Sequence, residues 1–193
     1  MNIVLSKPLL LASNSPRRRQ LLKECGFSFE VAVRPTDETY PDDMPPDDVP
    51  AYLARQKAEQ FLPNPGERLI LCADTIVVKD AQILNKPANP EEARQMLLML
   101  SGSTHQVITG ICLLDNSKFR TETDTALVTF CTLTEREIET YIQSESPFDK
   151  AGAYGIQDWI GMVGIERIEG SFYTIMGLPT HRVYQLLSPY FLN

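Results

Sequence analysis

Apolar runs typical of β-strands alternate along this chain with helical patterns, several of which open on a capping residue or a proline. Strand patterns occur at 9–12, 27–33, 69–73, 75–78, 82–84, 105–115 and 119–132. Helical patterns occur at 16–25, 51–62, 90–101, 134–142 and 180–187. This alternation is typical of an α/β fold in which helices flank a mixed sheet.

Turn-forming residues mark the expected boundaries of these elements. Gly26, Gly102 and the Asn64-Pro65-Gly66 segment are expected to end helices. The strand at 69–73 is expected to end at Asp74. The glycine-rich region 149–179 predicts loops mixed with short strands. The length of 193 residues suits one compact domain, 1–193.

The charge and hydropathy patterns exclude several classes of partner. A formal net charge of −7 makes the chain a poor general binder of nucleic-acid polymers, whose backbones require a basic surface. No apolar run approaches the roughly 20 residues that cross a bilayer. Lys7-Pro8 splits the apolar N-terminal stretch, and no early positive charge precedes it. We therefore expect a cytoplasmic protein without membrane contact.

The cysteines and histidines carry no metal or disulfide pattern. The four cysteines form no CxxC pair, which favours ordinary reduced thiols. His105 and His181 are far apart in the sequence and are interpreted as structural or exposed side chains.

A cluster of arginines at an expected helix start is the first candidate site. Ser13-Asn14-Ser15-Pro16 leads from a strand into a helix that begins with Arg17, Arg18 and Arg19. Positive side chains are unfavourable at a helix N-terminus, unless an anion binds there. Serine hydroxyls, backbone N–H groups and the forks of Arg17 and Arg18 would then converge on phosphate oxygens. The alternative is a solvated basic turn.

An aspartate after five apolar residues is the second candidate. Asp74 follows the 69–73 run, where a charged group is costly unless it is paired or binds a metal. Beside a phosphate site it would bind a metal or take a proton from water. A hairpin-capping aspartate is the alternative.

The third candidate is the acidic segment 35–50, which holds five of the chain's 14 prolines and is expected to be a long loop. Glu38 could supply a carboxylate to the magnesium that accompanies triphosphates, whereas 42–48 is interpreted as a solvated acidic stretch. Lys57, Lys86 and Lys150 are candidates for phosphate contacts, or are surface lysines.

Several nucleotide-binding and nucleophile motifs are absent from the sequence. No GxxxxGK[ST] or GxSxG segment occurs, and no GxGxxG segment follows a strand. Water activated by a metal and a carboxylate is therefore preferred over a covalent route.

Taken together, the motifs resemble those of the Maf family of nucleotide pyrophosphatases. The matching segments are 11–18 (LASNSPRR), 72–78 (CADTIVV), Lys86-Pro87, 99–107 (MLSGSTHQV), Thr109-Gly110, 149–157 (DKAGAYGIQ), 168–173 (IEGSFY) and 177–179 (GLP). The resemblance implies an α/β fold like that of inosine triphosphate pyrophosphatases, with two lobes around a central cleft. It also implies a homodimer, a divalent metal (Mg²⁺ or Mn²⁺) and cleavage of a nucleoside triphosphate between its α- and β-phosphorus.

The resemblance also assigns roles to particular residues. Asp74 is similar to the family's catalytic proton acceptor, and Glu38 resembles one of its phosphate or metal contacts. Arg17, Thr75 and Gln157 fall where the family sets substrate preference, and this trio resembles the subgroup that prefers dTTP and UTP. Phosphate contacts are implied for Ser13, Ser15, Arg18, Lys57, Lys86 and Lys150. Asn85 stands where the family often has a glycine before Lys-Pro.

Two other functions remain open at this stage. The family's name is tied to inhibition of septum formation, so a non-enzymatic regulator of cell division is one alternative. House-cleaning of non-standard purine triphosphates is the other.

Overall fold

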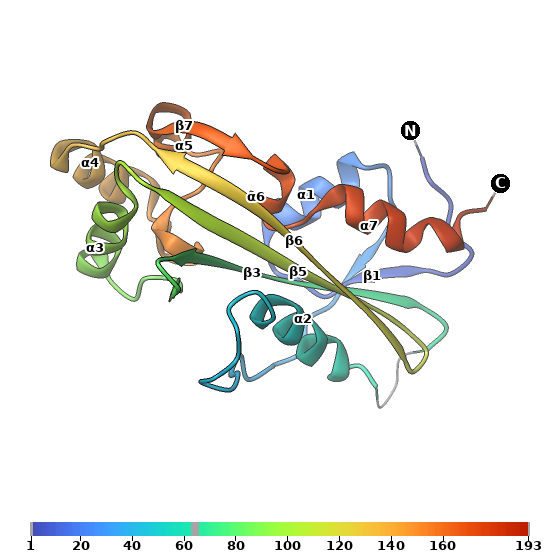
Figure 1. The fold of residues 1–193 in the computed structure, drawn as a ribbon. Coiled ribbons are helices and arrows are strands. Elements are labelled where there is room, and N and C mark those ends of the chain that lie inside the picture. Colours follow the sequence, from blue (N-terminus) through green and yellow to red (C-terminus); the bar gives the residue numbers. More distant parts are fainter. Residues whose placement is uncertain (1, 63–65, 193) are drawn as a thin grey trace. The chain divides into compact units, whose positions relative to one another are not determined.

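The computed structural model describes residues 2–62 and 66–192 (Figure 1). These residues form two compact units. The first unit comprises the described residues of Met1–Asp74, Thr109–Asp124 and Gly177–Asn193. The second unit comprises Thr75–Ile108 and Thr125–Met176. The chain crosses between the units at four points, after Asp74, Ile108, Asp124 and Met176.

The strands form a mixed sheet, as the sequence predicts. They are β1 (Leu9–Leu11), β2 (Glu30–Val31), β3 (Leu69–Lys79), β4 (Gln82–Leu84), β5 (Thr104–Asp115), β6 (Lys118–Phe130) and β7 (Ile165–Glu169). Hydrogen-bonded neighbours follow the order β2-β1-β3-β5-β6-β7, and β4 pairs with β3. β1 is parallel to β2 and β3, whereas β3–β4 and β6–β7 are antiparallel.

The helices agree with most of the predicted positions. They are α1 (Pro16–Glu24), α2 (Val49–Glu59), α3 (Pro90–Leu100), α4 (Glu135–Glu145), α5 (Trp159–Gly164), α6 (Phe172–Ile175) and α7 (Thr180–Leu187). Short 3₁₀ helices occupy Pro147–Asp149, Ala151–Ala153 and Ser188–Tyr190. The predicted caps are present: Ser15 accepts from the Arg18 amide, Asn89 accepts from the Glu92 amide, and Thr134 and Glu137 form a capping box.

In the first unit, helices lie on both sides of the strands (Figure 1). α2 packs on one face, where its alanines at 54 and 58 meet Ile70 and Cys72 of β3. A side chain at Gly110 of β5 would come within 2.2 Å of the backbone nitrogen of Ala51, so glycine allows the start of α2 to approach the strand closely. This packing brings Lys57 on α2 towards β3.

The second unit has a core of its own. Buried residues of α3 and α4 pack with β3, β5 and β6 residues, among them Leu97, Val107, Phe130 and Tyr141. Outside this core, Arg94 of α3 forms ion pairs with Glu135 and Glu139 of α4.

Several predicted boundaries are wrong. β3 does not end at Asp74 but continues to Lys79, because neither glycine nor proline interrupts it. The strand expected at 27–33 shrinks to two residues, since it is an edge strand that pairs only with the three-residue β1. α2 begins at Val49, inside the expected loop, because Pro50 is tolerated in the first turn of a helix. Asn64 and Pro65, expected to end this helix, lie outside the described residues.

The glycine-rich region contains two helices that the sequence does not predict. α5 forms although glycine is a poor helix former. A side chain at Gly161 would come within 2.1 Å of the Ile156 carbonyl oxygen. Close packing within the second unit therefore explains glycine at this helical position.

Candidate active site

At the start of α1, two serine hydroxyls accept hydrogen bonds from backbone amides. The Ser13 hydroxyl accepts a hydrogen bond from the Ser15 amide at 3.2 Å, and the Ser15 hydroxyl accepts from the Arg18 amide at 3.4 Å. Ser13 is buried, while Ser15 and Arg17 are half-buried. The segment that the sequence predicts to bind an anion therefore has an ordered hydroxyl and amide framework at a helix N-terminus.

Arg18 joins this turn to the strand that carries Asp74. Its guanidinium donates to the carbonyl oxygens of Gly177 and Ala73 at 2.7 and 2.8 Å, and to the Ser13 hydroxyl at 3.4 Å. Burial lowers the pKa of Arg18 from its usual value, and the carboxylate of Asp74 acts in the opposite direction. Arg18 thus ties the helix start to the backbone beside Asp74, in addition to any contact that it makes with phosphate.

Two carboxylates in the first unit meet at one ammonium group. Lys57 Nζ lies 2.8 Å from Glu38 Oε1 and also contacts Asp74 Oδ1. The Asp74 and Lys57 side chains are 13% and 17% exposed, whereas Glu38 is 51% exposed and faces solvent. The three side chains come from β3, α2 and the acidic loop, and they form a charged cluster with an open side.

Strand periodicity explains why Asp74 reaches Lys57. Side chains at alternate positions of a strand point to the same face, so Asp74 shares the α2-facing side of β3 with Cys72 and Ile70. The loop that carries Glu38 is attached to the same helix, since the Gln56 side chain donates to the Thr39 carbonyl oxygen at 3.1 Å.

The second unit carries the remaining candidates. Lys150 Nζ lies 3.0 Å from Asp149 Oδ1 and 3.3 Å from Asp158 Oδ2. Gln157 and Lys86 are exposed, and Thr75 is half-buried in β3. The Gly152 amide donates to the Asn85 carbonyl oxygen at 3.2 Å, which joins the segments that carry Lys150 and Lys86. Asp158 was not among the predicted site residues.

The structure therefore distributes the predicted residues over both units. The first unit contains Ser13, Ser15, Arg17, Arg18, Glu38, Lys57 and Asp74, and the second contains Thr75, Lys86, Lys150 and Gln157. Contacts among the side chains themselves link Ser13 with Arg18, and Lys57 with Glu38 and Asp74.

The donor set of the charged cluster suits magnesium or manganese bound together with a phosphate ligand. Among residues 2–62 and 66–192, no group of three or more His, Cys, Asp or Glu side chains converges as a metal site. Mg²⁺ commonly binds through one or two carboxylates, substrate phosphates and water. Glu38 and Asp74, which converge on Lys57, fit that kind of site.

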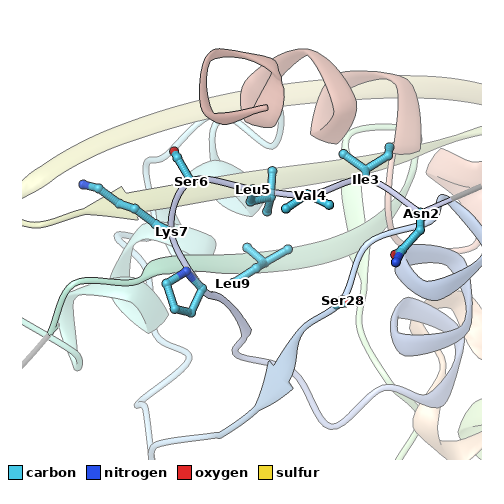
Figure 2. A pocket seen from close by; sticks show the side chains of 9 residues that line it. Asn2, Ile3, Val4, Leu5, Ser6, Lys7, Leu9 and Ser28 are labelled. Carbon is cyan, nitrogen blue, oxygen red and sulfur yellow. The ribbon is translucent and has the colours of Figure 1, made fainter. Parts of the chain in front are cut away.

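Other candidate groups lie apart from these clusters. A cavity of about 300 Å³ is lined by residues 2–9 and Ser28, and by none of the predicted site residues (Figure 2). His105 is buried and its Nε2 lies 2.7 Å from the Tyr154 hydroxyl, whereas His181 is exposed. The interpretation of the two histidines as structural or exposed side chains is therefore confirmed. All four cysteines are unpaired thiols.

Comparison with known proteins identifies the family. Residues 8–190 match the family described as Maf-like protein. The chain belongs to the Maf family. The family match covers nearly all of both units and includes every predicted site residue.

Similar proteins carry a specific name. A "dTTP/UTP pyrophosphatase" of Phocaeicola vulgatus is 48% identical over 179 residues, which are 91% of this chain and 92% of that protein. A protein of the same name from Halalkalibacterium halodurans is 48% identical, with 94% of this chain and 95% of that protein covered. One from Porphyromonas gingivalis is 45% identical and covers 94% of each.

Among solved structures, the Staphylococcus aureus Ham1 protein is similar at 13% identity. The superposition covers 64% of this chain and 72% of the Ham1 chain, with a TM-score of 0.47. This likeness is too distant to assign the fold. Within the described residues, no helix is both long enough and apolar enough to cross a membrane.

Proposed function

We propose that this protein hydrolyses dTTP and UTP to the nucleoside monophosphate and pyrophosphate. The observation that carries the proposal is the charged cluster of Asp74, Lys57 and Glu38 in the first unit, where Arg18 also bonds the backbone beside Asp74. Metal-assisted phosphoryl chemistry uses three kinds of group: a carboxylate that accepts a proton, a second carboxylate, and a cationic side chain. The names of the relatives support the choice of substrate.

In the proposed mechanism, the protein supplies positioning and charge. Ser13, Ser15 and Arg18 bind phosphate oxygens at the start of α1, and Lys57 neutralises further phosphate charge. Asp74 accepts a proton from the water that attacks the α-phosphorus, and pyrophosphate leaves. Glu38 and Asp74 would hold a divalent ion, which supplies neutralisation and polarisation of the phosphates when it is bound. Lys57, in contact with both carboxylates, keeps them oriented before substrate arrives.

The residues proposed to select the base are Arg17, Thr75 and Gln157. An exposed glutamine offers one acceptor and two donors, which match the alternating acceptor and donor groups on the edge of a thymine or uracil. The family subgroup that this trio resembles has the same preference.

Pyrophosphate release from a nucleotide panel tests the proposal. The panel holds dTTP, UTP, CTP, ITP and 7-methyl-GTP, each with and without Mg²⁺ or Mn²⁺. Metal-dependent cleavage led by dTTP and UTP is expected. A preference for ITP or 7-methyl-GTP would support pyrophosphatase activity but contradict the proposed selection of thymine and uracil by Arg17, Thr75 and Gln157. If folded protein cleaves none of them, the regulatory alternative replaces the enzymatic one.

We also propose a homodimer, as the family resemblance implies, and a cytoplasmic location, as the N-terminal sequence pattern predicts. Light scattering should then give about twice the chain mass of 21.7 kDa, whereas a value near 21.7 kDa would contradict the dimer.

A further inference from the structure

A second lysine–carboxylate cluster, in the second unit, includes a buried tyrosine. Asp158 Oδ2 accepts a hydrogen bond from the Tyr141 hydroxyl at 2.7 Å and lies 3.3 Å from Lys150 Nζ. Tyr141 is fully buried in α4, and the side chains of Lys150 and Asp158 are each only 11% exposed. Charged groups held this far from water restrict one another's positions strongly.

The hydroxyl of Tyr141 has one available direction for its proton. The Gly155 amide donates to this oxygen at 3.1 Å, so the amide occupies one of its lone pairs. A phenol has a single O–H donor, and Asp158 Oδ2 is its acceptor. Burial, and next the bond to Asp158, raise the pKa of Tyr141, so the hydroxyl stays protonated as a donor.

Asp158 in turn restrains the ammonium of Lys150. An ammonium group has three donors; here Asp149 accepts a hydrogen bond from one of them, and Asp158 forms an ion pair with the same ammonium. A side chain at Gly155 would come within 2.4 Å of Asp158 Oδ2, so glycine at this position allows the carboxylate to lie close against the loop. The position of Lys150 therefore depends on Tyr141 through Asp158.

We infer that Tyr141 and Asp158 are positioning residues that hold the Lys150 ammonium where it binds a phosphate group of the substrate. The inference rests on the proposed function, in which Lys150 contacts phosphate. Tyr141 acts from the interior of α4 without touching the nucleotide. Its hydroxyl is thus part of the phosphate-binding apparatus as well as of the core.

The first unit offers a matched control for this network. There, Lys7 Nζ lies 2.5 Å from Asp115 Oδ1, and the Tyr190 hydroxyl donates to Asp115 Oδ2 at 2.9 Å. This is the same lysine–aspartate–tyrosine chemistry, and it contains none of the residues proposed to bind substrate. Tyr190→Phe removes an equivalent hydroxyl and should leave turnover unchanged.

The test is a double-mutant cycle on Tyr141→Phe and Lys150→Met. The measured quantities are kcat and KM for dTTP, the dissociation constant of inorganic pyrophosphate, and the melting curve of each variant. Tyr141→Phe should lower kcat/KM by about tenfold and weaken pyrophosphate binding, because a misplaced cation loses much of its effect. In the Lys150→Met background the same change should cost less than about twofold, since the lysine it positions is gone.

The outcomes separate this inference from the proposed function. The inference would be overturned if Tyr141→Phe had wild-type kinetics. It would also be overturned if Tyr141→Phe lowered kcat/KM by the same factor in the wild-type and the Lys150→Met backgrounds. If Tyr141→Phe does not fold, Asp158→Asn gives the same test, because it retains the shape but loses the charge. A wild type without dTTP cleavage refutes the proposed function, while the pyrophosphate affinities still decide the role of Tyr141. A folded wild type that neither cleaves dTTP nor binds pyrophosphate overturns both.

Discussion

At the scale of single residues, Asp74 carries the chemistry of the proposed reaction. Replacement of Asp74 by asparagine keeps its volume and removes the proton acceptor. Loss of a general base commonly costs about 10²–10⁴-fold in rate. We therefore expect Asp74→Asn to lower kcat for dTTP by at least about 100-fold in a protein that still folds.

The control for this variant is Asp47→Asn. Asp47 is an exposed residue of the acidic loop, and the Asp47→Asn variant should retain the wild-type kcat for dTTP. Substantial activity in Asp74→Asn would remove Asp74 from the mechanism. A loss in Asp47→Asn as well would instead implicate the general charge of the loop.

His105 provides a prediction about pH and stability. Burial lowers its pKa from 6.5 to about 4, and the positive charge of Lys79 adds to this effect. The unfolded chain binds this proton more readily than the folded chain. Neutral His105 therefore makes its full contribution to the free energy of unfolding above pH 6.5. As the pH falls from 6.5 towards 4, this contribution is lost, which lowers the free energy of unfolding by up to about 3 kcal/mol.

Urea unfolding at pH 7 and pH 4.5 measures this loss. The wild type and the exposed-site variant His181→Gln should lose more stability on acidification than His105→Gln does. An equal loss in all three proteins would show that the proton uptake does not occur at His105.

At the scale of elements, the start of α1 should act both as a cap and as a phosphate site. Ser15 and Thr134 are both N-caps whose side chains accept an amide hydrogen bond. Replacement of either by alanine should lower the free energy of unfolding by about 1 kcal/mol. Only Ser15→Ala should also raise the KM for dTTP, and equal KM values in the two variants would contradict a phosphate site at α1.

The extent of prediction from sequence also differs between elements. The α1, α3 and α4 segments were predicted well because their N-caps are local signals, and α7 has the apolar spacing of a helix at Val183, Leu186 and Leu187. α5 was missed because this short helix has no side-chain cap hydrogen bond and contains Gly161 and Gly164, which are poor helix formers. The end of β3 was misplaced because Asp74 is a polar residue inside a strand, accommodated by Lys57 from another element.

The candidate site was only partly predictable for a similar reason. Asp74, Lys57 and Glu38 were singled out by charge and by family resemblance, but their meeting at one ammonium depends on the packing of α2 against β3. The attachment of Arg18 to two carbonyl oxygens could not be foreseen, because backbone acceptors carry no sequence signature. Tyr141 shares the apolar spacing of Ile138 and Ile142 in α4, and only its hydroxyl partners distinguish it from an ordinary core residue.

At the scale of the whole molecule, metal removal should abolish turnover without unfolding the protein. Two protein carboxylates alone bind Mg²⁺ weakly, and the remaining ligands come from phosphate and water. Chelation by EDTA should stop pyrophosphate release, added Mg²⁺ or Mn²⁺ should restore it, and the melting temperature of the nucleotide-free protein should not change. Full activity in EDTA would contradict the proposed metal site.

The most direct test of the proposed function is product analysis of dTTP hydrolysis in ¹⁸O-labelled water, followed by ³¹P NMR. Attack of water at the α-phosphorus predicts dTMP and pyrophosphate, with the label in dTMP alone. Formation of dTDP and phosphate, or pyrophosphate that carries the label, would contradict the proposed cleavage.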